Sequence, residues 1–265
     1  MKRTGLVVPG VALWLVGCGG GEKGGGGGGG APPAAGTPAA TEQPAAAPAG
    51  AGGGSITGMV KFSGTAPANP PIDMSEEAAC KAKYSSHPTD PQVVVSNGML
   101  GNVFVYVKSG LPAGASYPAL TAPAVIDQNG CLYHPRVFGV MVGQPIEIRN
   151  SDAVLHNIKA VPTANRGFNI SQPTAGMKTT RTFKTAEVMV PLECNVHGWM
   201  NAWVGVVAHP FFATSGADGA FTIQGLPAGT YELEAWHEKF GTQTVSVTVP
   251  ATGSVTADFT FAPKA

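Results

Sequence analysis

Three side chains that bind soft metal ions lie close together in residues 194–200. They are Cys194, His197 and Met200. A thiolate and a thioether favour Cu(I), and an imidazole suits Cu(II), so this set is suited to a copper ion that changes between two oxidation states. The Cys-x-x-His spacing also occurs in zinc sites. The segment therefore predicts a metal site, for copper or for zinc.

A second imidazole precedes this segment. Residues 146–149 have the pattern of a strand, a turn follows, and His156-Asn157 comes next. His156 lies 38 residues before Cys194, which leaves room for the intervening strands of a Greek key. Two imidazole nitrogens and one cysteine sulfur, with a weak axial methionine, are the ligands of a type 1 copper site. The order of the four side chains along this chain matches that set.

The elements that must position these side chains are short strands separated by turn residues. From residue 55 onward apolar and polar residues alternate, and the only short helix expected is 74–84, with Ser75 as its N-cap. The expected strands are 56–62, 103–107, 136–141, 145–149, 178–184, 187–190, 202–208, 219–223, 230–236, 243–249 and 254–261. This spacing predicts an all-β chain built of β-sandwiches.

Residues 90–208 resemble the plastocyanin/amicyanin-like cupredoxins, on the strand, turn and His-Asn motif together with the compact ligand loop. The resemblance implies a Greek-key β-sandwich that holds one type 1 copper ion. It implies His156, Cys194 and His197 as strong ligands and Met200 as the axial ligand.

The same resemblance assigns roles beside the metal. Asn157 would form the hydrogen bonds that hold the ligand loop beside the cysteine. Glu193 directly precedes Cys194, where these families usually carry an aromatic residue. This departure either lowers the reduction potential of the copper or places the side chain in solvent. Trp199 lies inside the loop, where it could shield the metal or contact a partner.

The end of the chain has a second signature. An Asp-Gly turn at 218–219, an alternating strand, a Pro-Gly turn and another strand resemble the carboxypeptidase regulatory-like (transthyretin-like) β-sandwich family over 213–262. The stretch GSITGMVKFSG near residue 55 resembles that family's first strand. We therefore expect the copper domain to be inserted within this small sandwich or packed on it. The expected parts are a leading strand and short helix at 55–91, a cupredoxin domain at 92–210 and the second sandwich at 211–265.

The beginning of the chain predicts export. Two basic residues precede a short apolar stretch at 6–16, and the stretch ends in a motif that resembles the bacterial lipobox, with Cys18 as the lipidated residue. A plain secretory signal is the alternative. Residues 1–18 would be the signal peptide, and the Gly/Pro/Ala-rich residues 19–54 a disordered linker. Gly19 after the cysteine implies a lipid anchor in the outer membrane of the cell envelope, facing the periplasm or the cell surface.

The remaining cysteines and histidines have weaker signals. In an oxidising compartment Cys80 and Cys131 could form a disulfide worth about 2–4 kcal/mol, and two free thiols are the alternative. His134 is either a surface residue or close to the copper. His237 belongs to the second sandwich, as part of its fold or of a docking surface.

Charge and residue order restrict the function. Lys+Arg and Asp+Glu both number 16 and form no basic stripe, so nucleic-acid binding is not expected. No triad or carboxylate pair stands out, and four metal ligands leave no open position, so we do not expect an enzyme or a copper-delivery protein. We expect a one-electron carrier with a redox protein partner in the envelope. The alternative is a binding or scaffold lipoprotein whose sandwich engages a partner or polysaccharide, with the copper site secondary.

Overall fold

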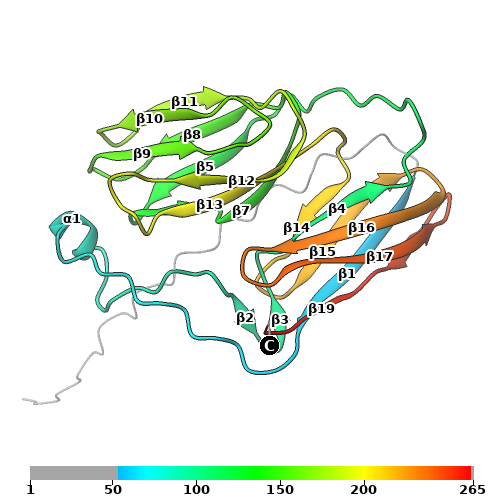
Figure 1. The fold of residues 1–265 in the computed structure, drawn as a ribbon, viewed down its shortest axis with the longest axis horizontal. Coiled ribbons are helices and arrows are strands. Elements are labelled where there is room, and N and C mark those ends of the chain that lie inside the picture. The colour runs from blue at the N-terminus through cyan, green and yellow to red at the C-terminus, as the bar shows by residue number, and fades with distance from the viewer. Residues whose placement is uncertain (1–52, 264–265) are drawn as a thin grey trace, which may run out of the picture. The chain divides into compact units, whose positions relative to one another are not determined.

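A computed structural model describes residues 53–263, and almost all of their regular structure is β-strand. The expected signal peptide, Cys18 and nearly all of the expected linker lie outside these residues. The strands form two β-sandwiches, so the chain is all-β, as the alternating pattern predicted (Figure 1). None of the described residues belongs to a helix with the length and apolar character needed to cross a membrane.

The first sandwich has a five-stranded sheet, in the order β10-β9-β12-β13-β7, and a four-stranded sheet, in the order β11-β8-β5-β6. Its strands are β5 (Ala124–Asn129), β6 (Leu132–His134), β7 (Val137–Met141), β8 (Ile146–Asn150), β9 (His156–Ala160), β10 (Phe168–Gln172), β11 (Lys178–Arg181), β12 (Glu187–Glu193) and β13 (Asn201–Val207). Alternate residues of β8 point inward, with Ile146 and Ile148 fully buried in the core between the sheets. Burial of such side chains contributes about 1.5–3 kcal/mol each.

The second sandwich combines strands from both ends of the described chain. One sheet is β15-β1-β3-β2, with β18 and β19 also paired to β1, and the other is β14-β4-β16-β17. The strands are β1 (Gly54–Phe62), β2 (Val95–Ser96), β3 (Met99–Leu100), β4 (Phe104–Ser109), β14 (Phe212–Thr214), β15 (Ala220–Leu226), β16 (Gly229–His237), β17 (Gly241–Val249), β18 (Ser254–Thr256) and β19 (Phe259–Phe261). Strand β1, blue in Figure 1, lies beside the orange and red strands of the C-terminal part.

These pairings correct one expected boundary. Strands β2 to β4 lie within the expected cupredoxin range 92–210, but β4 pairs with β14 and β16 of the second sandwich. The alternation in 103–107 predicted a half-buried strand but carried no information about its partners. The first sandwich begins at β5 and ends with β13. It is inserted between β4 and β14, which pair with each other.

The only helix among the described residues is shorter than expected. It is α1 (Ala78–Lys81), which lies inside the expected range 74–84. Its N-cap position is Glu77, so the expected bounds and the expected cap Ser75 were wrong. The Ser75 backbone N–H instead donates to the Asp73 carboxylate (2.9 Å), which closes a turn just before the helix. The segment's apolar residues pack with the two cysteines in a small separate cluster.

Candidate metal centre

The predicted ligands come from one end of the five-stranded sheet. His156 is the first residue of β9, and Cys194 directly follows β12, its antiparallel neighbour in the sheet. The loop at 194–200 then connects β12 to β13. In an antiparallel pair the start of one strand lies beside the end of the other. The pairing of β9 with β12 therefore brings His156 and Cys194, 38 residues apart in sequence, close together.

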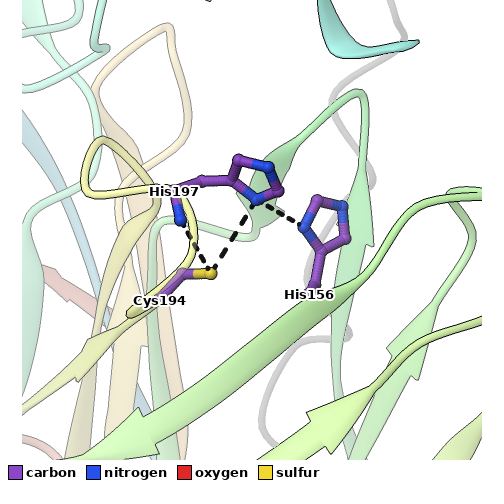
Figure 2. A group of neighbouring side chains, drawn as sticks. All are labelled: His156, Cys194 and His197. Carbon is purple, nitrogen blue, oxygen red and sulfur yellow. Dashed lines mark hydrogen bonds between the residues drawn. The ribbon is translucent and has the colours of Figure 1, made fainter. Parts of the chain in front are cut away.

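Three donor atoms converge there. His156 Nδ1 lies 2.9 Å from His197 Nδ1, and His197 Nδ1 lies 3.9 Å from Cys194 Sγ (Figure 2). The three side chains each offer one ligand atom, and these atoms lie within 4.8 Å of one another. All three residues are buried, with exposed fractions of 0%, 4% and 2% for His156, Cys194 and His197. The structure thus brings together the three predicted strong ligands.

The imidazole of His156 is held by its other nitrogen. His156 Nε2 lies 2.9 Å from the Asp152 carboxylate, which is itself fully buried. Because the carboxylate can only accept, Nε2 carries the proton, and the lone pair of neutral His156 is on Nδ1, which faces the other donors. The same carboxylate accepts from the Cys131 backbone N–H (2.7 Å) and pairs with Lys83 Nζ (2.8 Å).

The two imidazoles favour the thiolate form of Cys194. Burial raises the pKa of its thiol, but interactions with His156 and His197 outweigh burial and lower the pKa to about 5. Burial lowers the pKa of His156, while the hydrogen bonds to Asp152 and Cys194 outweigh it and raise the pKa. A thiolate with two imidazole nitrogens, in a buried setting, is a donor set that fits copper or zinc.

Backbone hydrogen bonds of Met200 close the ligand loop. Its backbone N–H donates to the His197 carbonyl (2.9 Å), and its carbonyl accepts from the Cys194 N–H (3.1 Å). The Met200 side chain is fully buried in the same apolar cluster as Cys194. Its role as axial ligand stays a prediction.

Asn157 forms the hydrogen bonds that were expected of it. Its Oδ1 atom accepts from the backbone N–H groups of Asn195 (2.7 Å) and Val196 (3.3 Å), and it lies 3.4 Å from Cys194 Sγ. Its Nδ2 group donates to Asn169 Oδ1 on the neighbouring strand (2.7 Å). The ligand loop is therefore fixed to the sheet through one side chain.

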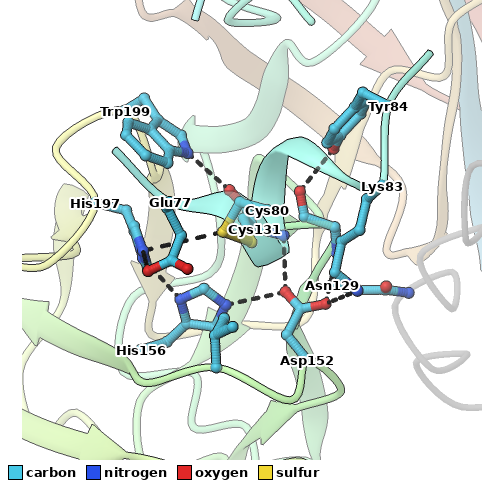
Figure 3. Close-up of a disulfide and its surroundings, with 12 residues drawn as sticks. Glu77, Cys80, Lys83, Tyr84, Asn129, Cys131, Asp152, His156, His197 and Trp199 are labelled. Carbon is cyan, nitrogen blue, oxygen red and sulfur yellow. Dashed lines mark hydrogen bonds and ion pairs between the residues drawn. A yellow bond between two sulfur atoms is a disulfide. The ribbon is translucent and has the colours of Figure 1, made fainter. Parts of the chain in front are cut away.

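The far edge of His197 is covered by the segment that contains α1. His197 Nε2 lies 3.7 Å from the Glu77 carboxylate and 4.0 Å from Cys80 Sγ (Figure 3). The indole of Trp199 lies beside the His197 ring, with centroids 5.0 Å apart, and its Nε1–H donates to the Cys131 carbonyl (2.9 Å). Trp199 thus shields the imidazole.

The structure contains the Cys80–Cys131 disulfide. The S–S distance is 2.00 Å, the Cα atoms are 5.7 Å apart, and both residues are fully buried. It links α1 to the turn between β5 and β6, where Tyr84 also donates to the Gly130 carbonyl (2.6 Å). Figure 3 shows the two sulfurs directly beside His197 and His156.

The weaker histidine candidates lie outside the three-donor cluster. His134 Nε2 contacts the Asn129 carbonyl (3.2 Å) within the β5–β6 hairpin, and of the two alternatives the structure does not support a place beside the three donors. His237 is fully buried against Phe240 in the second sandwich and belongs to the fold, not to a docking surface. Burial, with the nearby cations Arg136 and Lys239, lowers its pKa to about 4.

Glu193 faces solvent. Its side chain is 44% exposed and lies 3.6 Å from Lys159 on the neighbouring strand. Sequence reasoning missed two carboxylates that the structure places at the imidazoles, Asp152 and Glu77. A signal existed for Asp152, because it stands four residues before a predicted ligand in a turn. None existed for Glu77, which is brought to His197 by the disulfide.

Comparison with protein families finds one match, in the C-terminal part of the chain. The Carboxypeptidase regulatory-like domain family matches residues 201–262. No curated protein matches the chain.

Three solved structures illustrate the similarities found. A purple cupredoxin from Nitrosopumilus maritimus has 22% identity and a TM-score of 0.28, covering 31% of this chain and 98% of its own. An amicyanin variant in its Cu(I) form has 20% identity and a TM-score of 0.28, covering 40% and 98%. A copper-containing nitrite reductase from Thermus scotoductus has 18% identity and a TM-score of 0.29, covering 37% and 25%.

Proposed function

We propose that the chain is a type 1 copper protein that carries single electrons between redox proteins of the cell envelope. The observation that carries the proposal is the buried convergence of one thiolate and two Nδ1 atoms, from Cys194, His156 and His197. Copper bound there would supply a one-electron couple between Cu(I) and Cu(II).

The chain's own residues prepare the site for such a role. Asp152 fixes the orientation and tautomer of His156, and Asn157 fixes the loop that carries the other ligands. Burial of the three ligands keeps water out. A site whose ligands are held in place in both oxidation states needs little rearrangement when an electron arrives or leaves.

With Met200 as a fourth ligand, no coordination position remains open for a substrate, and we propose that the protein is not an enzyme. Its place would be the cell envelope, attached to the outer membrane by lipid on Cys18, with residues 19–54 as the tether. The signal-like start of the sequence supports this location.

The first prediction tests the copper site itself. The purified protein, loaded with Cu(II), is expected to absorb intensely in the visible range, because the Cys194 thiolate transfers charge to Cu(II). Cys194→Ala is expected to lose this band and to change the EPR spectrum to that of an ordinary Cu(II) site. Absorption and EPR spectra of the same samples are the measurement.

Val196→Ala is the matched control, since Val196 lies in the same loop, is 47% exposed and supplies no ligand atom. It should keep the band. A colourless wild-type protein that retains zinc when challenged with copper would contradict the proposal. The scaffold alternative expects partner capture that Cys194→Ala does not change.

A further inference from the structure

Both imidazoles of the metal centre have a second ring nitrogen, and both of these nitrogens face the disulfide. His156 Nε2 lies 2.9 Å from the Asp152 carboxylate, and His197 Nε2 lies 4.0 Å from Cys80 Sγ. Cys131 Sγ, an oxygen of Asp152 and a nitrogen of His156 lie within 4.8 Å of one another. Figure 3 shows these side chains gathered around the S–S bond. Cys131, Asp152 and His156 therefore form a second group of potential ligands, which shares His156 with the first.

In the oxidised state this group lacks strong sulfur donors, because a disulfide carries no thiolate. Reduction by a dithiol or a phosphine adds two electrons and two protons to the S–S bond, which breaks and leaves one thiol each on Cys80 and Cys131. A divalent ion that binds there displaces those two thiol protons, and the Nε2 proton of His156 moves to Nδ1 of the same ring. The ion then meets two thiolates, the freed lone pair of His156 Nε2 and one carboxylate. Four such ligands are a tetrahedral set of the kind that zinc prefers.

The charges of the group match a divalent cation. The two thiolates and Asp152 would carry three negative charges, and Lys83 Nζ, 2.8 Å from the carboxylate, supplies one positive charge. Three minus one leaves two, the charge that a divalent ion neutralises. Cys80, Cys131 and Asp152 are all fully buried, where uncompensated charge is costly.

We propose that Cys80, Cys131, Asp152 and His156 form a second metal site, for zinc or a similar thiophilic divalent ion, which the disulfide closes. His156 is common to both sites. The oxidation state of the cysteine pair therefore determines on which side of this imidazole a metal is held. An oxidising envelope closes the second site and directs the metal to Cys194. The inference goes beyond the proposed function, and its test needs no copper.

The test uses the full chain with Cys194→Ala, so that Cys80 and Cys131 are the only cysteines left beside the imidazoles. A phosphine reduces the disulfide: phosphorus gives two electrons and takes the oxygen of one water, whose two protons go to the sulfurs. After removal of the phosphine, the protein is titrated with Co²⁺, a coloured substitute for zinc. We expect one Co²⁺ per chain, with a sulfur-to-cobalt charge-transfer band and the strong visible bands of a tetrahedral site.

Three matched samples decide the result. Cys194→Ala with its disulfide intact should show no sulfur-to-cobalt band, and neither should the phosphine-treated variant that also carries Cys80→Ser and Cys131→Ser. Adding Asp152→Asn to the reduced protein should weaken cobalt binding by about tenfold or more. Zn²⁺ should displace the cobalt and abolish the band.

Two outcomes would overturn the proposal. One is the absence of the band in reduced Cys194→Ala that keeps its circular-dichroism spectrum, and the other is an equal band in the Cys80→Ser, Cys131→Ser sample. If reduction alone unfolds the chain, cobalt that restores the native spectrum supports the site, and a chain still unfolded with cobalt refutes it. Neither result affects the copper test, which uses Cys194 and an intact disulfide.

Discussion

At the scale of single residues, Asn157 connects a strand to the ligand loop through one carboxamide. Replacing it in Asn157→Ala leaves the N–H groups of Asn195 and Val196 without their acceptor. A lost partner in a partly buried setting costs about 1–3 kcal/mol. We therefore expect the metal-free variant to lose about that much unfolding free energy in urea titrations, and its copper-loaded spectrum to shift as the loop relaxes.

Asn201→Ala is the control for this change. Asn201 lies at the other end of the same loop and donates only one long bond, to the Gly198 carbonyl at 3.3 Å. Its loss should stay within about 0.5 kcal/mol. If the two variants unfold at the same urea concentration, Asn157 does not hold the loop.

The sequence was sufficient for the donors but not for their surroundings. Cys194 and His197 could be predicted because their side-chain chemistry and spacing are local information, and His156 because the His-Asn motif after a strand resembles that of a known family. The contacts of Asp152 and Glu77 depend on how a turn and a distant segment pack against the imidazoles, which no periodicity records. The two alternatives for His134 stayed open for the same reason, because the sequence does not say which way the side chain of a hairpin residue points.

At the scale of elements, Glu187 ties the loop after β9 to the start of β12. Its carboxylate accepts from Thr163 Oγ1 (2.9 Å) and from the backbone N–H groups of Ala164 (3.0 Å) and Asn165 (3.2 Å). Burial raises the pKa of Glu187, but the donors at Thr163 and Asn165 outweigh it and lower the pKa to about 2. This carboxylate therefore holds residues 163–165 beside β12, and we call its hydrogen bonds to them the clasp.

Glu187→Gln should open the clasp. We expect amide hydrogen exchange at 163–165 to rise several-fold, since the neutral side chain accepts more weakly and through one oxygen. The folded pKa lies below the ordinary value of 4.5. Glu187 thus stabilises the fold fully above that value and loses its contribution as pH falls from 4.5 to about 2, so the variant's stability should fall less over this range.

Glu193→Gln is the matched control, because Glu193 ends the same strand and contacts only Lys159, at 3.6 Å. Exchange at 163–165 should not change in this variant. An equal increase in both variants would mean that the effect is not specific to the clasp.

Periodicity missed the strands β2, β3, β5, β6, β9, β10 and β14. Three of these carry polar residues that the structure buries: Gln128 in β5, His156 and Asn157 in β9, and Gln172 in β10. Alternation predicts a strand only when one face is apolar and the other polar. Buried polar residues hide that contrast, and near the candidate site they are numerous because they hold the ligands.

At the scale of the whole molecule, a buried ion cluster joins three distant segments. Arg136, next to β7, pairs with Asp90 and with Glu238, which follows β16. The three side chains are 7%, 10% and 8% exposed. Arg136→Ala would leave two buried carboxylates without a cation, and we expect it to lower the unfolding free energy by about 3–5 kcal/mol, measured by urea denaturation.

Arg149→Ala provides the comparison, since Arg149 is 41% exposed and pairs with Glu147 at the surface. Its effect should not exceed about 1 kcal/mol. A loss for Arg136→Ala as small as that for Arg149→Ala would show that water reaches the cluster.

The boundary between the two sandwiches was the least predictable part of the fold. Strand β4 has the same alternating pattern whether it pairs with β9 or with β16, and only the packed structure selects β14 and β16. The pairing of β1 with the C-terminal strands was anticipated from a resemblance to a known first strand, not from periodicity. Local pattern thus predicted strands, and partner choice needed more information.

Strand β1 has most of its hydrogen-bonding partners near the other end of the described residues, in β15, β18 and β19. During synthesis the complete inserted sandwich therefore emerges from the ribosome before those partners of β1 emerge. During that interval the nascent β1 presents unpaired backbone groups, which invite pairing with other chains. If the chain is exported as we propose, translocation as an extended polypeptide followed by folding would supply all of these partners at once and remove the hazard.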